Sequence, residues 1–105
     1  MTDRELLELA AKAAGIEWYG YCGDDKTEVH YFDIGPDEVV KWNPLTNDGD
    51  AFRLAVELCI SIRYLRRPGV VIAGSAVGIG YADDRAAATR RSIVRAAAKR
   101  YKEPR

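Results

Sequence analysis

Histidine and cysteine are scarce in this sequence of 105 residues, which contains one histidine, His30, and two cysteines, Cys22 and Cys59. Structural zinc sites need several closely spaced cysteine and histidine ligands, so we expect no metal site. Two cysteines are too few for a disulfide framework, and we expect both to be reduced thiols. No serine, cysteine or carboxylate pair accompanies His30 in the local sequence. We therefore expect no catalytic residues, no enzymatic activity and no cofactor.

Long apolar runs are also missing. The least polar stretch, residues 68–82, is interrupted by glycine and falls short of the roughly 18 apolar residues that a bilayer span requires. The N-terminal residues are charged from Asp3 onward and lack the basic, then apolar pattern of a secretory signal. A chain of this length builds one hydrophobic core. We expect a single domain, residues 1–105, located in the cytoplasm and without a membrane partner.

The net charge is zero, but the charges are unevenly distributed along the chain. Residues 17–50 contain two basic and nine acidic side chains, whereas residues 51–105 contain twelve basic and four acidic ones. This asymmetry can steer a charged partner toward the protein. It can equally hold the two halves of the domain, or two protomers of a homodimer, together.

The first half of the sequence predicts a helix followed by strands. Thr2 and Glu5 have the spacing of a capping box, in which each side chain satisfies a free backbone N–H of the other, and Gly15 is suited to end the helix. Aromatic and β-branched residues then lie on both sides of a turn-forming segment, which predicts a hairpin. The predicted elements are a helix at 3–14, a hairpin at 16–34 with its turn at 23–26, and a turn of helix or a brief extended segment at 37–41.

The second half predicts a helix, further strands and a long C-terminal helix. Four apolar side chains recur at helical spacing and are expected to face the core from the first of these helices: Phe52, Ala55, Val56 and Cys59. The C-terminal helix is expected to start at a capping aspartate, Asp83 or Asp84, and to bury Ile93, Ala97 and Tyr101. The predicted elements are a helix at 50–59, strands at 61–66 and 70–75 around a turn at 67–69, a bent strand at 76–81, and a helix ending at about 101.

This order of elements, α-β-β-α-β-β(-β)-α, predicts an α+β fold in which helices cover an antiparallel sheet as an αβα sandwich. The strand order within the sheet cannot be read from the pattern.

The segment WNPLTNDGD, residues 42–50, has the composition of a binding loop. It fails as a calcium loop, because aligning Gly49 with the loop glycine puts Pro44 at the first ligand position. It is well suited to start a helix from Thr46, Asn47 or Asp48. Capping does not require the first two residues of the segment, so a binding role remains open. The candidate residues for binding a ligand or partner are Trp42, Asn43, Asp48, Asp50, Arg90 and Arg91.

Basic residues recur along the C-terminal helix at spacings that place them in one stripe. Such a stripe can contact nucleic-acid phosphates, and it can equally be a solvated face or pair with the acidic segment 17–50. The glycine-rich segment 74–80 lacks the Lys-Ser/Thr ending of a phosphate loop. The candidate phosphate contacts are Arg91, Arg95, Lys99 and Lys102.

Three segments, DRELLELAAKAAGI, WNPLTNDGDAFRLAVEL and AAATRRSIVRAAAKR, resemble a family of small bacteriophage and prophage proteins that carry the phage αβα-sandwich domain. The resemblance implies a phage origin, a sandwich fold and an accessory function instead of virion building. The resemblance does not indicate any chemical reaction that the protein would catalyse. We expect a non-enzymatic protein that binds a host protein or complex and antagonises a defence or regulatory system. The alternatives are a protein that sequesters a nucleotide or signalling molecule, and a nucleic-acid-binding regulator.

Overall fold

The computed structural model describes residues 2–15, 17–21, 30–35, 38–67, 69–74, 78–80 and 84–102. For residues 17–21, 30–35, 38–41 and 102, only the backbone is described. Several expectations therefore lie outside the described residues: the turn at 23–26, the thiol of Cys22, the imidazole of His30, the first half of the bent strand, and Asp83 as a cap.

The three helices begin at capping side chains, as the sequence predicts. They are α1 (Asp3–Ala13), α2 (Asp48–Glu57) and α3 (Arg85–Lys102). Each capping oxygen accepts a hydrogen bond from a backbone N–H in the first turn that has no partner within its own helix. The three bonds are Glu5 N to Thr2 Oγ1 (3.2 Å), Asp50 N to Asn47 Oδ1 (2.9 Å) and Ala87 N to Asp84 Oδ1 (2.9 Å). Gly15 follows α1 with φ +75, the left-handed conformation expected of it.

The strands form two antiparallel sheets of three strands each within the described residues. In the first sheet, β1 (Glu17–Tyr21) pairs with β2 (His30–Gly35), which pairs with β3 (Glu38–Trp42). In the second, β4 (Ile62–Leu65) pairs with β5 (Val70–Ala73), which pairs with β6 (Ile79–Gly80). The extended alternative for residues 37–41 is therefore the observed one.

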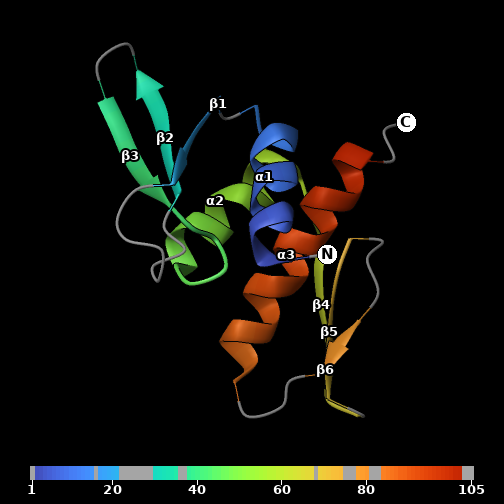
Figure 1. Cartoon of the computed structure of the whole chain (residues 1–105). Helices are drawn as coiled ribbons and strands as arrows, with labels where there is room; N and C mark the ends of the chain where they lie inside the picture. The colour runs from blue at the N-terminus through green and yellow to red at the C-terminus, as the bar shows by residue number, and fades with distance from the viewer. Residues whose placement is uncertain are drawn as a thin grey trace.

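The helices lie between the two sheets, as Figure 1 shows. The central element is α3, which packs against α1 and α2 and also against β5 and β6. The first sheet meets the helices through the contact of β1 with α1 and through Trp42, which ends β3 and belongs to the core. The rest of β2 and β3 lies farther out. The α+β class and the antiparallel strands are confirmed. The strands are divided between two sheets, and because α3 fills the middle, the two do not merge into one.

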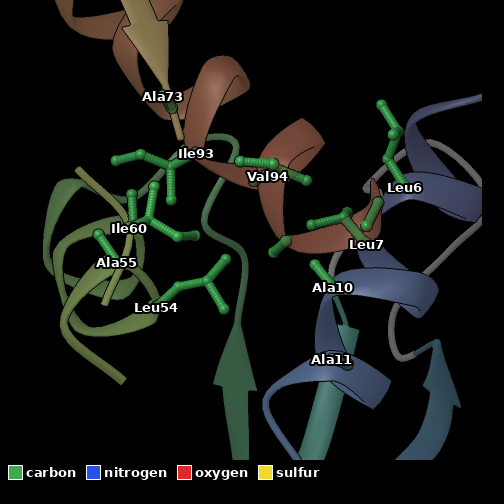
Figure 2. Close-up of a cluster of buried hydrophobic side chains, with 14 of the residues drawn as sticks. Leu6, Leu7, Ala10, Ala11, Leu54, Ala55, Ile60, Ala73, Ile93 and Val94 are labelled. Atoms are coloured by element: carbon green, nitrogen blue, oxygen red, sulfur yellow. The ribbon is translucent and has the colours of Figure 1, made fainter. Parts of the chain in front are cut away.

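The core is built largely from small side chains of the helices and from a few larger anchors, among them Leu7, Leu54 and Val94 (Figure 2). In α3 the buried residues follow one another with little interruption from Ser92 to Ala98, because the helix is covered from several sides. Alanine at these positions lets neighbouring helices approach closely, since the distance between helix axes depends on the side chains at the contact.

The predicted buried face of α2 is wrong at three of its four residues, and of the four only Ala55 is buried. Phe52 and Val56 are 68% and 60% exposed, whereas Ala51, Leu54 and Ala55 are buried. Both sets recur at helical spacing, and the pattern favoured the set with the larger side chains. The helix is therefore rotated by about one residue, roughly 100°, from the expected orientation.

Two further residues differ from the expected burial. Tyr101 is 46% exposed at the end of α3, where the ammonium group of Lys12 lies 5.9 Å from the centre of its ring. Cys59 is exposed instead of facing the core. Ile93 and Ala97 are buried, as predicted.

Candidate functional site

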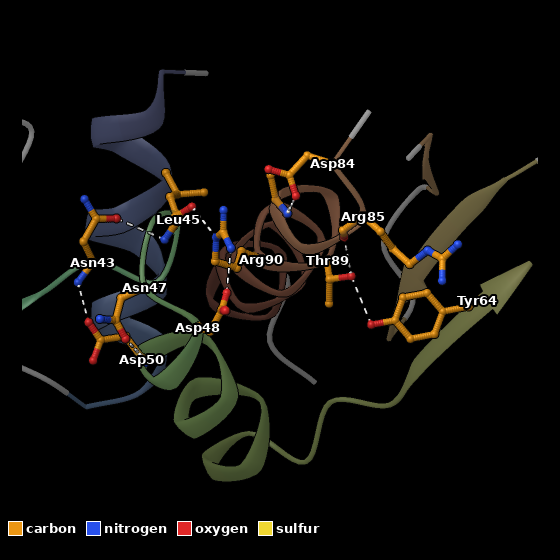
Figure 3. A network of polar contacts seen from close by, with 11 residues as sticks. Asn43, Leu45, Asn47, Asp48, Asp50, Tyr64, Asp84, Arg85, Thr89 and Arg90 are labelled. Carbon is orange, nitrogen blue, oxygen red and sulfur yellow. Dashed lines mark hydrogen bonds and ion pairs between the residues drawn. The ribbon is translucent and has the colours of Figure 1, made fainter. Parts of the chain in front are cut away.

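The loop that precedes α2 is closed by hydrogen bonds of its own (Figure 3). The side-chain oxygen of Asn43 accepts a bond of 3.0 Å from the backbone N–H of Leu45, and the backbone N–H of Asn43 donates a bond of 2.9 Å to the carboxylate of Asp50. Asn47 caps the helix, so it is the cap among the three candidates. Trp42 is 8% and Asn43 is 7% exposed, and Trp42 is part of the core. The loop is thus a packed structural element that leaves these two side chains little surface for a partner.

Arg90 is the arginine that α3 brings to this loop. Its Nε donates a hydrogen bond of 2.9 Å to the main-chain carbonyl of Leu45, and its Nη1 lies 2.6 Å from a carboxylate oxygen of Asp48. The Arg90 side chain is 17% exposed, whereas that of Asp48 is 77% exposed. The same guanidinium therefore ties α3 to the backbone of the loop and places a pair of opposite charges at the surface.

Arg91 does not join the loop. Its guanidinium instead binds the carboxylate of Asp3 at the start of α1, with N–O distances of 2.9 and 2.6 Å. Of the predicted basic stripe, Arg95 and Lys99 are exposed on α3. The side chain of Lys102 lies outside the described residues. Among the described side chains of the stripe, Arg95 and Lys99 are thus exposed, whereas Arg91 joins α3 to α1.

A groove opens on the other side of Arg90, between α2, β4 and α3, with a volume of about 560 Å³. Its floor is apolar and includes Ala51, Ile62 and Ile93, and Phe52 and Tyr64 flank it as exposed aromatic side chains. The complete lining is Asp48, Ala51, Phe52, Ile62, Tyr64, Arg85, Ala86, Thr89, Arg90 and Ile93.

The ring of Tyr64 is fixed against α3 by its hydroxyl group (Figure 3). Thr89 donates its hydroxyl proton to the carbonyl of Arg85 at 2.8 Å, and the Tyr64 hydroxyl lies 3.0 Å from the same threonine oxygen. Because a hydroxyl has a single proton to donate, Tyr64 is the donor to Thr89. The aromatic wall of the groove is thereby pre-oriented, which lowers the entropic cost of placing it against a partner.

Two of the groove residues, Asp48 and Arg90, are among the binding residues that the sequence predicts, but no sequence pattern indicates the groove itself. The apolar pattern of α2 assigns Phe52 to the core and therefore not to a binding site. The signal that could have found it is the second apolar stripe of the helix, formed by Ala51, Leu54 and Ala55, which turns Phe52 outward. Tyr64 carries no comparable local signal, because its position beside α2 and α3 depends on how the elements pack.

The chain is thus an α+β domain with an open groove that two exposed aromatic side chains flank. No protein-family model, curated protein or solved structure matches the chain. Across the described ranges, no three histidine, cysteine, aspartate or glutamate side chains gather where they could hold a metal ion. None of the described helices combines the length and the apolar composition needed to cross a membrane.

Proposed function

We propose that the protein is a non-enzymatic phage or prophage accessory protein that binds a host macromolecule through the groove between α2, β4 and α3. The observation that carries this proposal is the exposure of two aromatic side chains, Phe52 (68%) and Tyr64 (50%), beside one open apolar groove. Aromatic anchors next to a pocket supply much of the binding energy in protein interfaces. Clustered apolar exposure on a soluble domain marks interaction sites.

A macromolecule fits this surface because the apolar area continues beyond the groove. Val56 lies one helical turn after Phe52 on the outer side of α2 and is 60% exposed, but it does not line the groove. A partner that covers both residues must extend past the groove itself. The phage setting and the antagonism of a host defence or regulatory system rest on the resemblance of three sequence segments to small phage proteins.

The test compares capture of host proteins by the wild type, by the double variant Phe52→Ser/Val56→Ser, and by Tyr101→Ser. Tyr101 is an exposed aromatic residue outside the groove and serves as the matched control. We expect the wild type and Tyr101→Ser to recover the same macromolecule from a bacterial lysate at physiological salt, and the double variant to lose it. Binding must then be reproduced with the purified partner. Recovery that is the same for all three proteins, or no specific recovery, would refute the proposal.

A small ligand is the second candidate, favoured by the dimensions of the groove. Its volume of about 560 Å³ lies within the roughly 300–1,000 Å³ typical of ligand pockets. The Asp48–Arg90 pair adds both signs of charge to an apolar floor, which suits a zwitterionic or hydroxyl-rich molecule. Native mass spectrometry of gently purified protein checks this alternative: a retained small molecule supports it, and protein of the bare polypeptide mass counts against it.

A further inference from the structure

The groove lies along the outer edge of β4. The strand order β4-β5-β6 puts β5 on one side of β4, and no described strand pairs with its other side. Residues of β4 line the groove, but none of β5 or β6 does. An edge strand presents backbone groups that can pair with a further strand, and many peptide-binding domains take up extended segments in this way.

Three exposed arginines lie on β4 and in the turn that follows it. Side chains alternate across a strand, so Ile62 and Tyr64 face the groove and Arg63 faces outward with Leu65. Arg66 and Arg67 follow in the turn after β4. All three arginines are exposed, and no carboxylate among the described residues forms an ion pair with them.

The surrounding charge has the same sign. Residues 48–105, which form α2, the second sheet and α3, contain twelve basic and six acidic side chains. Unpaired cations beside an apolar surface attract an anionic partner and accelerate its association.

We infer that β4 and the groove bind an extended peptide segment in which acidic and apolar residues alternate, as an additional strand at the edge of the second sheet. This inference rests on the proposed function of the groove. A strand added beside β4 points every second side chain into the groove, between Phe52 and Ile93, and the others toward the outer face that carries Arg63. Apolar residues fit the first set of positions, and carboxylates fit the second, because opposite charges on neighbouring strands stabilise each other.

A second copy of the chain is a poorer occupant of this edge. Pairing β4 with the β4 of another molecule would bring the two sets of Arg63, Arg66 and Arg67 into one interface. Like charges placed opposite each other on neighbouring strands are destabilising.

The experiment uses a fluorescein-labelled peptide of seven residues in which glutamate alternates with phenylalanine and valine, titrated with the full-length protein by fluorescence anisotropy. A peptide with lysine in place of glutamate tests the charge. Two further peptides carry N-methyl groups on the odd or on the even residues, and one of them blocks the backbone groups that face β4. We expect the lysine peptide and one of the two methylated peptides to bind at least about tenfold more weakly than the parent.

The matched protein variants are Arg63→Glu/Arg67→Glu and Arg95→Glu. Arg95 is also an exposed arginine, but it does not line the groove or belong to β4. We expect the double variant to lose about tenfold in affinity and Arg95→Glu to bind as the wild type does. Circular dichroism melting establishes that each variant is folded before its affinity is interpreted.

Three results would overturn the inference: no binding of the glutamate peptide, equal binding of the lysine peptide, or binding of both methylated peptides as tightly as the parent. Tighter binding of a ten-nucleotide oligothymidylate than of the peptide would also overturn it, in favour of a nucleic-acid surface. If the peptide fails while Phe52→Ser/Val56→Ser still abolishes capture of the host macromolecule, the proposed function stands without this mode of binding. If both fail, the groove is not the binding site.

Discussion

The carboxylate of Asp50 accepts a hydrogen bond of 2.9 Å from the backbone N–H of Asn43, seven residues earlier in the chain. Both residues are buried. The bond fixes the path of the chain between β3 and α2, and it gives a buried donor a charged acceptor. Hydrogen bonds to charged groups are stronger than those between neutral ones.

We expect Asp50→Ala to lower the free energy of unfolding by about 2 kcal/mol, because the buried N–H of Asn43 loses its acceptor. The control is Arg53→Ala, which removes the ion pair between Arg53 and Asp50 but keeps the bond to Asn43. The Arg53 side chain is 72% exposed, so its loss should cost no more than about 1 kcal/mol. Urea unfolding followed by circular dichroism measures both. Equal effects of the two variants would contradict the role given to Asp50.

The orientation of α2 is tested by comparing Phe52→Ser with Leu54→Ala. Phe52 is exposed, so its replacement should change the free energy of unfolding by less than about 0.5 kcal/mol. Leu54 is 3% exposed in the core, and its truncation should cost about 2–5 kcal/mol. Thermal and urea unfolding of the two variants decide the matter. A large loss of stability in Phe52→Ser would instead indicate that Phe52 is buried, as the sequence pattern predicts.

Arg90→Lys should destabilise the protein more than Asp48→Ala does. Lysine retains the charge, but it cannot donate from two fixed positions to Leu45 and Asp48 at once. We expect a loss of about 1–2 kcal/mol for Arg90→Lys. Asp48 is mostly exposed, and its removal should cost less than about 1 kcal/mol. If Asp48→Ala proved the more damaging change in urea unfolding, the ion pair and not the bond to the Leu45 carbonyl would hold α3 to the loop.

Gly78, which directly precedes β6, and Gly80, which lies in β6, should differ in their tolerance of alanine. A Cβ atom at Gly78 would lie 2.5 Å from Cγ1 of Val70 and 3.3 Å from Cγ1 of Ile72, which forces the neighbouring side chains to move. At Gly80 the nearest atom would be 3.9 Å away. We expect Gly78→Ala to cost about 1–3 kcal/mol and Gly80→Ala to be close to neutral, as measured by the shift in urea midpoint. Similar midpoints for both variants would refute the steric argument.

The helix starts, the end of α1 and most strand positions could be predicted from the sequence, because each depends on residues that are close together in the chain. The capping oxygens of Thr2, Asn47 and Asp84 lie within three residues of the N–H groups that they accept from, and Gly15 ends α1 through its own backbone conformation. Strand positions follow from β-branched residues and turns. The division of the strands into two sheets depends on where α3 packs, which no local pattern specifies.

The candidate site was predicted less well for the same reason. The ion pair between Arg91 and Asp3 joins residues 88 positions apart, so the sequence could not show that Arg91 was already engaged. Trp42 was attractive as a binding residue because aromatic side chains in polar loops are unusual, but the tertiary packing buries it. Two apolar stripes of α2 both recur at helical spacing, and the sequence pattern assigns Phe52 to the core although the other stripe is the buried one.

The central position of α3 also determines which parts of the domain can unfold locally. Because α3 contacts both other helices and the second sheet, we expect the backbone amides of its buried middle part to exchange with deuterium only when the whole domain unfolds. The first sheet meets the helices mainly through β1 and through Trp42 at the end of β3. The outer parts of β2 and β3 can therefore separate from the domain at a smaller cost in free energy. Hydrogen exchange should resolve two tiers of protection within this one small domain.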